Sequence, residues 1–257
     1  MIPAMGDSAA VSTSEPVVLV ATATSRHSAL VRITHWITTL CFIALLVTGF
    51  ELVISHPRFY WGETGNILTT PLFKIPIPSS RDLVPTGYGY VLPDQNGWSR
   101  YLHFQAAWLL VLTAMIYGID GLMSGHFRKD MLPAKAQRSW QVLRSTLSGH
   151  LRFKRPTEAE SRSYNLLQRI SYIGVIFILF PLEIWTGLAL SPAFVSAVPA
   201  AVNLLGGTQS ARTIHFINSL ALLLFVLVHV WMVSRSGFRS RMRAMTIGEA
   251  ETPKVAP

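Results

Sequence analysis

The chain has 257 residues, of which 50% are hydrophobic and only 14% are charged. A soluble domain usually carries charge on about a quarter of its residues, so this composition argues against an ordinary soluble protein. The formal net charge of +9 could suggest nucleic-acid binding. The basic residues, however, lie between long apolar blocks, which is typical of a membrane protein with basic loops and excludes a nucleic-acid partner.

Residues 1–25 lack the basic start of a signal peptide, and their apolar run is short. We expect them to form a disordered cytoplasmic tail. Residues 238–257, which end in ETPKVAP, are expected to form a second cytoplasmic tail. Residues 26–237 then constitute one membrane domain.

Four stretches of this domain are long enough to cross a bilayer, which requires about 20 apolar residues. They are approximately 31–54, 101–123, 168–191 and 212–234. The third contains Pro181, which a membrane helix tolerates as a kink. The sequence therefore predicts an all-α membrane protein that folds as a four-helix transmembrane bundle.

Lysine and arginine are unevenly distributed over the connections. The 124–167 loop holds nine of them, whereas the connection between the third and fourth spans has none before Arg212. Four arginines follow the fourth span, and the long first connection holds only four basic residues. Cytoplasmic loops carry the excess of positive charge, so we expect this loop and both termini in the cytoplasm.

Cys41 is the only cysteine, so the chain has no internal disulfide, no CxxCH motif for covalent haem and no cysteine set for an iron–sulfur cluster. Histidine offers more chemistry. Four of the eight histidines lie at or near span ends, namely His35, His103, His215 and His229. One polar side chain in a membrane helix could be a hydrogen-bonded packing residue, but four at matched depths indicate a functional interior.

The spacing within the fourth span explains two of these histidines. His215 and His229 are 14 residues apart, so at roughly 100° and 1.5 Å per residue they share a helix face about 21 Å apart. The alternating direction of the spans pairs His35 with His229 on the cytoplasmic side and His103 with His215 on the outer side. Two stacked bis-histidine sites are what two b-type haems require, and they suit electron transfer. The pairs are too far apart for a single zinc site.

Smaller signals accompany the histidines. Arg32, Arg100 and Arg212 each precede a histidine by three residues and could bind haem propionates, although arginines at helix ends also snorkel to the surface. Gly49 and Gly118 follow a histidine by 14 and 15 residues and could leave room for a porphyrin face, or serve ordinary helix packing. The pairs Thr48-Gly49 and Thr186-Gly187 recur at the outer ends of two spans, but they are too short to define a repeat.

Three segments resemble the bacterial di-haem cytochrome b family of cytochrome b561 type: HSALVRITHWITTLCFIALLVTGF, SYNLLQRISY and ARTIHFINSLALLLFVLVHVWMV. Members of this family are membrane subunits of nickel hydrogenases, formate dehydrogenases and thiosulfate reductases. The resemblance covers roughly 26–237. It implies that His35, His103, His215 and His229 ligate two haems b through their iron. It also implies a multi-pass subunit of the bacterial inner membrane, carrying electrons between an outer-side catalytic or electron-transfer subunit and the quinone pool.

The same resemblance implies where a quinone would bind. YNLLQR at 164–169 is similar to a family motif beside the cytoplasmic-side haem, which implies that Asn165 and Gln168 lie near the quinone. An amide can hydrogen-bond a quinone carbonyl; helix capping and surface solvation are the alternatives. The relatives have a small residue where this chain has Leu166-Leu167.

The long 56–99 connection, rich in proline and aromatic residues, is expected to form an outer lid or a docking surface for a partner. A weak resemblance suggests that this partner contains molybdopterin.

Two other functions compete with this interpretation. One is a stand-alone cytochrome b561-type oxidoreductase that exchanges electrons between quinone and a small molecule such as superoxide. The other is a haem-free transporter or proton pathway, although the spans hold few carboxylates, chiefly Glu51, Asp120 and Glu183.

Overall fold

The computed structural model describes residues 27–66, 68–77, 95–128, 144, 166–235 and 237–248. The expected tail at 1–25 lies outside these residues. The described chain is mostly helical, and four of its helices are long and apolar enough to cross a membrane: Ala29–Ser55, Gly97–Met123, Arg169–Ala189 and Thr208–Arg235. The predicted all-α architecture with four membrane-spanning helices is therefore confirmed.

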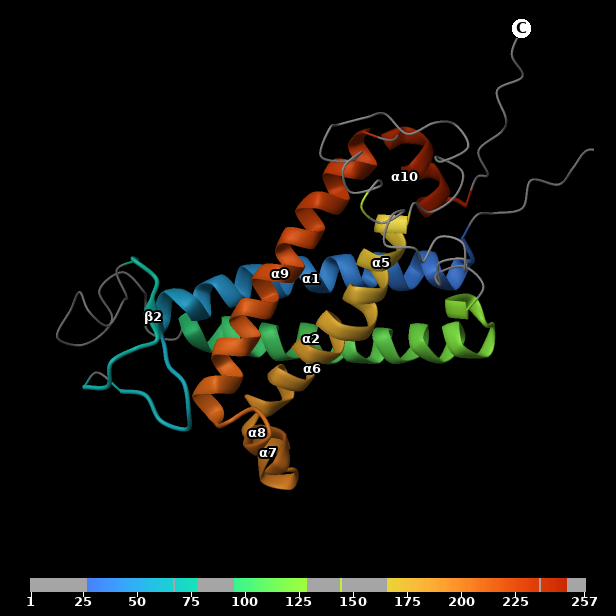
Figure 1. Cartoon of the computed structure of the whole chain (residues 1–257). Helices are drawn as coiled ribbons and strands as arrows, with labels where there is room; N and C mark the ends of the chain where they lie inside the picture. Colours follow the sequence, from blue (N-terminus) through green and yellow to red (C-terminus); the bar gives the residue numbers. More distant parts are fainter. Residues whose placement is uncertain are drawn as a thin grey trace, which may run out of the picture.

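The four spans form two antiparallel helical hairpins that cross each other (Figure 1). The first hairpin pairs α1 (Ala29–Ser55) with α2 (Gln95–Met123). The second pairs α9 (Thr208–Arg235) with a composite helix made of α5 (Leu166–Gly174), η3 (Val175–Leu179) and α6 (Phe180–Ala189). Close backbone approaches are concentrated within each hairpin, so that the two hairpins meet mainly through side chains.

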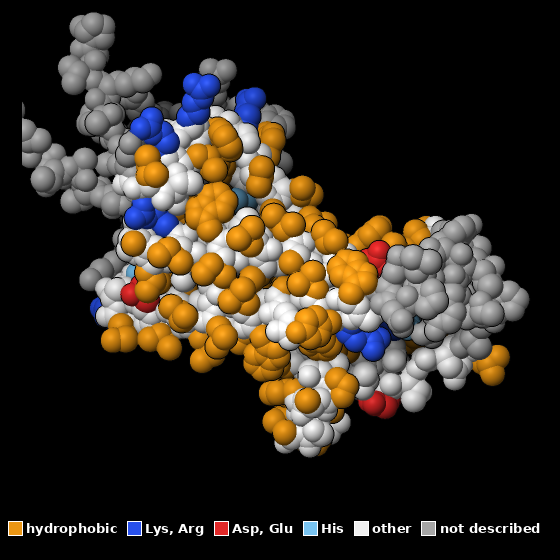
Figure 2. Space-filling model, turned by 180° about the vertical axis from the view of Figure 1, so that it is seen from behind, with side chains coloured by type: hydrophobic (Ala, Val, Ile, Leu, Met, Phe, Trp, Pro, Cys, Tyr) orange, Lys and Arg blue, Asp and Glu red, His pale blue; other side chains and the backbone are white. Residues whose placement is uncertain are grey.

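The outward faces of these helices are apolar. Leu40, Phe50, Leu112 and Leu224 are all more than half exposed, and hydrophobic side chains cover the flanks of the helices in Figure 2. Such an extended apolar surface would be a liability in water, but it is what a lipid-facing helix needs.

The third span changes its helical geometry just before its proline. Residues Val175–Leu179 form a π-helical segment, and α6, with Pro181 in its first turn, continues from it. Proline has no N–H group, and its ring clashes with the carbonyl four residues earlier in a regular α-helix. A wider turn upstream relieves that clash, and such π segments are commonly found at functional sites.

The connection after α1 folds back onto the start of α9. It contains a two-stranded antiparallel ribbon, β1 (Arg58–Phe59) and β2 (Phe73–Lys74). Beyond β1, the Gly62 carbonyl accepts hydrogen bonds from the backbone N–H groups of Gln209 and Ser210. The Glu63 carboxylate accepts two more from the N–H and hydroxyl of Thr208, at 3.1 and 2.9 Å. A helix N-terminus has unsatisfied N–H groups and favours negative charge, so Glu63 caps α9 from a distant part of the chain.

Two short helices join α6 to α9, namely α7 (Pro192–Ala197) and α8 (Ala200–Asn203). They close a small apolar core consisting of Ala189, Val202, Leu205 and Ala211. The indole N–H of Trp185 donates to the Ala201 carbonyl at 3.0 Å, which ties this turn to α6.

The chain continues past the fourth span as a further helix, α10 (Phe238–Thr246), where the sequence predicts only a tail. Gly237, with φ of 94°, makes the turn between α9 and α10. The indole of Trp36 donates to the Met245 carbonyl, and Arg32 donates to the Thr246 carbonyl. A helix of nine residues is marginal by itself, so contacts of this kind with α1 stabilise it. Residues 249–257 lie outside the described chain.

We predict that Gly207→Ala destabilises the end of the protein where residues 56–77 pack against the start of α9. Gly207 has φ of +113°, and an added Cβ would lie 2.6 Å from the Gly62 carbonyl. The strained backbone and the clash should together cost on the order of 1–3 kcal/mol. Thermal unfolding of the purified protein in detergent should therefore show a lower midpoint.

Gly97→Ala is the matched control, because a Cβ at this α2 position would meet no atom within 4 Å. Its midpoint should equal or slightly exceed that of the wild type, since alanine favours a helix. Equal midpoints for the two variants would contradict the docking of residues 56–77 on α9.

Candidate functional site

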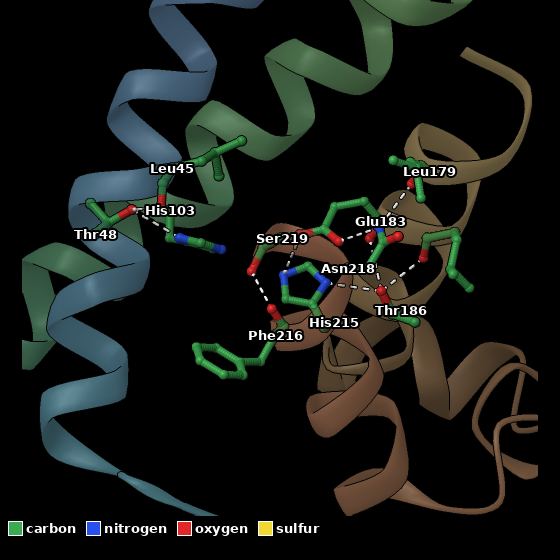
Figure 3. Close-up of polar contacts among 11 residues, drawn as sticks. Leu45, Thr48, His103, Leu179, Glu183, Thr186, His215, Phe216, Asn218 and Ser219 are labelled. Carbon is green, nitrogen blue, oxygen red and sulfur yellow. Dashed lines mark hydrogen bonds and ion pairs between the residues drawn. The ribbon is translucent and has the colours of Figure 1, made fainter. Parts of the chain in front are cut away.

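Two histidines from different hairpins face one another near residues 56–77. After the orientation expected from the sequence, we call these residues the outer segment and these two histidines the outer pair. His103 projects from α2 and His215 from α9, and their ring centroids are 6.4 Å apart with the planes inclined at 67°. Figure 3 shows the two rings pointing toward each other from opposite sides of the interface between the hairpins. The pairing of His103 with His215 expected from the sequence is therefore present in the fold.

A second pair, which we call the inner pair after the same expected orientation, lies toward the other end of α9. His35 projects from α1 and His229 from α9, again with ring centroids 6.4 Å apart and with planes inclined at 50°. The structure thus brings together all four predicted histidines, two by two. Each pair joins the first hairpin to the second.

The spacing within each pair suits two axial ligands of one metal. A metal–nitrogen bond of about 2 Å and roughly 1 Å from that nitrogen to the ring centroid place two axial rings about 6 Å apart. Both measured separations, 6.4 Å, agree with this value. The residues present therefore fit an iron between each pair of rings. No group of three or more His, Cys, Asp or Glu side chains that could hold a metal occurs in the described parts of the chain.

Each outer histidine has a threonine hydroxyl as its partner. Thr48 Oγ1, on α1, lies 2.8 Å from Nδ1 of His103, and Thr186 Oγ1, on α6, lies 2.9 Å from Nδ1 of His215. Both threonines are fully buried. In each hairpin, the threonine comes from the helix that pairs with the histidine's helix. The two hairpins therefore make the same contact.

The glycine after each threonine lies against the same imidazole. A Cβ added at Gly49 would lie 3.6 Å from Cε1 of His103, and one at Gly187 would lie 3.4 Å from Cε1 of His215. The recurring Thr-Gly pair of the sequence is therefore one structural unit that occurs twice. In each case the threonine hydroxyl contacts a ring nitrogen of the histidine, and the glycine backbone lies beside the edge of the same ring. Gly118 has no atom within 4 Å of where its Cβ would be, so its surroundings are open.

A buried carboxylate completes the outer site. Glu183 Oε1 lies 3.4 Å from Nε2 of His215, and Asn218 Nδ2 donates to Glu183 Oε2 at 2.7 Å and to the Leu179 carbonyl at 2.9 Å. Figure 3 shows this cluster between α6 and α9. The Thr186 contact occupies Nδ1 of His215 and leaves Nε2 as the nitrogen that would bind iron. Iron binding would therefore replace the contact between Nε2 and Glu183. Asn218 would keep its hydrogen bond to the Glu183 carboxylate.

The surroundings of the inner pair are aromatic instead. Phe225 stacks on His229 at 5.8 Å, and the ring of Tyr172 lies 6.2 Å from the same imidazole. Trp36 meets His35 edge-on at 5.4 Å. Nδ1 of His35 is buried and has no hydrogen-bond partner among the described residues.

The three arginines expected near propionates have different environments. Arg212 donates to the carbonyls of His56 and Arg58, and its guanidinium lies 5.0 Å above the Phe59 ring, so it fastens the outer segment to α9. Arg32 donates to the carbonyl that ends α10, and its Nε is buried with no hydrogen-bond partner in the described part of the chain. Arg100 is exposed at the start of α2. Propionate binding by these three side chains stays a prediction.

The residues expected near a quinone are less well defined. Asn165 lies outside the described residues, and Gln168 belongs to α5, although its side chain is not described. Tyr172, one turn further along α5, contacts the His229 ring. The start of the third span is therefore adjacent to the inner histidine pair.

Sequence reasoning did not assign Thr48, Thr186, Asn218 or Glu183 to the site. The recurring Thr-Gly pair was the sequence pattern that could have indicated the two threonines, but a repeat of two residues does not show that both pairs face histidines. Glu183 stood out only as an unusual carboxylate within a span. Its proximity to His215 depends on how α6 packs against α9.

Comparisons with known proteins agree with this geometry. The family model described as prokaryotic cytochrome b561 matches residues 26–248. A protein of Azospira oryzae named as a subunit of a protein-methionine-sulfoxide reductase, YedZ1, is 28% identical over 216 residues, which cover 81% of this chain and 89% of that protein. A protein of Cupriavidus necator named as the B-type cytochrome subunit of a Ni/Fe-hydrogenase is 24% identical over 239 residues, covering 87% and 84%.

No solved structure matches the sequence significantly. The family match extends over all four spans and includes both histidine pairs. A family of b-type cytochromes accounts for histidines in an apolar bundle, since imidazole is a common axial ligand of haem iron. The chain is a multi-pass membrane protein with b-type haem, and it belongs to the prokaryotic cytochrome b561 family.

Proposed function

We propose that the chain is a di-haem electron-transfer subunit that links an oxidoreductase partner on the outer side to the quinone pool. The observation that carries this proposal is the pair of cross-hairpin histidine contacts, both 6.4 Å between centroids, at two levels of α9. When bound, haem b supplies reversible one-electron transfer. His35 with His229, and His103 with His215, would each hold one haem, and the two haems would lie in sequence across the membrane.

The proposed orientation puts both termini in the cytoplasm of a bacterium, with the protein in its inner membrane. The His35–His229 pair lies beside α10, which contributes Arg239, Arg241 and Arg243. Lys and Arg side chains gather toward this end of the molecule in Figure 2. Positive charge marks the cytoplasmic side, so the His35–His229 site is the inner one and the His103–His215 site the outer one.

The proposed partner subunit docks on the outer segment. The described part of this segment, 56–66 and 68–77, exposes Trp61, Leu68 and Leu72, each by 60% or more. Its ribbon is joined to the outer haem site, because Phe59 stacks on Phe216, the residue after His215, at 4.4 Å. Two relatives are named as subunits of larger oxidoreductases, which also supports a catalytic partner. An aromatic, apolar surface of this kind is favoured at protein interfaces.

The proposed quinone site lies beside the inner pair, with Asn165 and Gln168 as hydrogen-bond donors to the quinone carbonyls. Its support is the position of α5, whose Tyr172 contacts the ring of His229. Electrons would then pass between the outer partner, the outer haem, the inner haem and quinone.

Histidine substitutions test the pairing directly. A pyridine haemochrome assay of the wild type should give two haems b per chain. The double variant His35→Ala/His229→Ala should retain one, because both substitutions remove the same site. The double variant His35→Ala/His103→Ala should retain well under one, since each substitution removes one ligand of a different site and weakens haem binding at both.

Equal haem content in these two double variants would contradict the pairing. His126→Ala is the control, because this histidine is in ring contact with Tyr117 and belongs to neither pair. Its haem content should equal that of the wild type. A wild-type protein without haem, made with ample haem supply, would favour the transporter instead.

Carbon monoxide tests whether both axial positions are filled. The dithionite-reduced wild type should show little spectral change under carbon monoxide, because two imidazoles occupy each iron. His215→Gly should open one position and give a carbon monoxide difference spectrum in the haem that remains at that site. Strong carbon monoxide binding by the wild type would contradict bis-histidine ligation.

Rapid-mixing kinetics test the quinone proposal. Reduced protein in proteoliposomes should be reoxidised by a quinone analogue, and Asn165→Ala or Gln168→Ala should slow reoxidation at least several-fold. Their haem content and reduced spectrum should be unchanged. Rates like that of the wild type in both variants would exclude these two amides from the quinone site.

A further inference from the structure

The two histidine pairs differ in the hydrogen bonds made by their rings. At the outer pair, both imidazoles have a threonine oxygen within 2.9 Å of Nδ1. At the inner pair, Nδ1 of His35 is buried without a partner, and no hydrogen bond to the ring of His229 is found among the described residues. From this asymmetry we propose that Thr48 and Thr186 are positioning residues that lower the reduction potential of the outer haem relative to the inner one. The inference rests on the proposed di-haem function.

The direction of these hydrogen bonds follows from the helix backbone. The Thr48 hydroxyl donates to the Ala44 carbonyl at 2.7 Å, and the Thr186 hydroxyl donates to the Leu182 carbonyl at 2.8 Å. A hydroxyl has only one proton to donate, so its oxygen must accept from the imidazole. Each outer histidine is therefore protonated on Nδ1, and its Nε2 lone pair is free for iron.

The donated hydrogen bond also changes the imidazole as a ligand. A metal-binding histidine that donates its other N–H to an acceptor is fixed in tautomer and orientation and becomes more basic. The hydroxyl's own bond to the carbonyl polarises its oxygen and strengthens this acceptor. A more basic axial ligand stabilises the oxidised, more positive iron, so the outer haem should be harder to reduce.

Threonine in a membrane helix often bonds to the backbone without any further role. Thr113 illustrates this case, because its hydroxyl donates to the Leu109 carbonyl at 2.7 Å and the residue is buried on α2. No contact of Thr113 with a histidine is found among the described residues. It therefore shares the packing and the backbone bond of Thr48 and Thr186 but lacks their imidazole contact.

Spectroelectrochemical titration of the haem-loaded protein in detergent tests the proposal. The wild type should show two separate midpoints. Thr48→Val and Thr186→Val should each raise the lower midpoint, and the double variant should raise it further, while the upper midpoint stays in place. Thr113→Val should leave both midpoints unchanged. Valine keeps the shape of threonine, so the shift reports the lost hydrogen bond.

The serine variants separate hydrogen bonding from packing. Thr48→Ser and Thr186→Ser keep the hydroxyl and remove a methyl group, so they should retain haem and the wild-type midpoints even if the valine variants bind haem poorly. Serine variants that shift the midpoint or lose haem as much as the valine variants would overturn the proposal. So would valine variants with an unmoved lower midpoint.

The assignment of the lower midpoint is checked in the variant His35→Ala/His229→Ala, where the remaining haem should titrate at the lower potential. A remaining haem at the upper potential would overturn the inference and leave the di-haem function intact. Fewer than two haems in the wild type would overturn both.

Discussion

An imidazole is costly to bury inside an apolar helix bundle, and this fold brings four of them together in pairs at two levels of one helix. α9 carries His215 and His229 on one stripe, and each faces a histidine of the first hairpin at 6.4 Å. The crossing of the hairpins in Figure 1 lets α1 meet α9 at one level and α2 meet it at another. If iron binds one nitrogen from each histidine of a pair, as we propose, the metal sites would also connect the two halves of the molecule.

The two levels are supported by different means. Around the outer site, Glu63 caps α9, Arg212 holds the ribbon, and two threonines orient the rings. Hydrogen bonds from several segments thus fix this end, which is the one proposed to meet a partner protein. The inner site is framed by aromatic rings and by α10, whose backbone is bonded to α1. Aromatic surroundings of this kind would suit the proposed exchange of electrons with a membrane-soluble quinone.

The sequence contains enough information for the spans, the histidine pairs and the family. Span length and apolarity follow from bilayer thickness, and the pairing follows from alternating helix direction together with the 14-residue spacing of His215 and His229. Both features can be read from residue spacing along the chain alone. α10 was missed because its three arginines resemble a solvated tail, whereas its stability comes from carbonyls that accept from Trp36 and Arg32.

The hydrogen bonds of the outer site were not predictable in the same way. Thr186 meets His215 only because α6 packs beside α9 in one particular rotation, and no spacing along the chain encodes that rotation. The same is true of Asn218 and Glu183, which are 35 residues apart in sequence. The guanidinium of Arg212 binds backbone carbonyls of the 56–77 segment, a contact that its position three residues before a histidine did not indicate.

The most direct test of the central claim is anomalous diffraction at the iron absorption edge from crystals of the haem-loaded protein. The account predicts two iron peaks per chain, one between His35 and His229 and one between His103 and His215, separated by about 20 Å because 14 helical residues rise about 21 Å. A single iron, or two irons with different histidine partners, would contradict it.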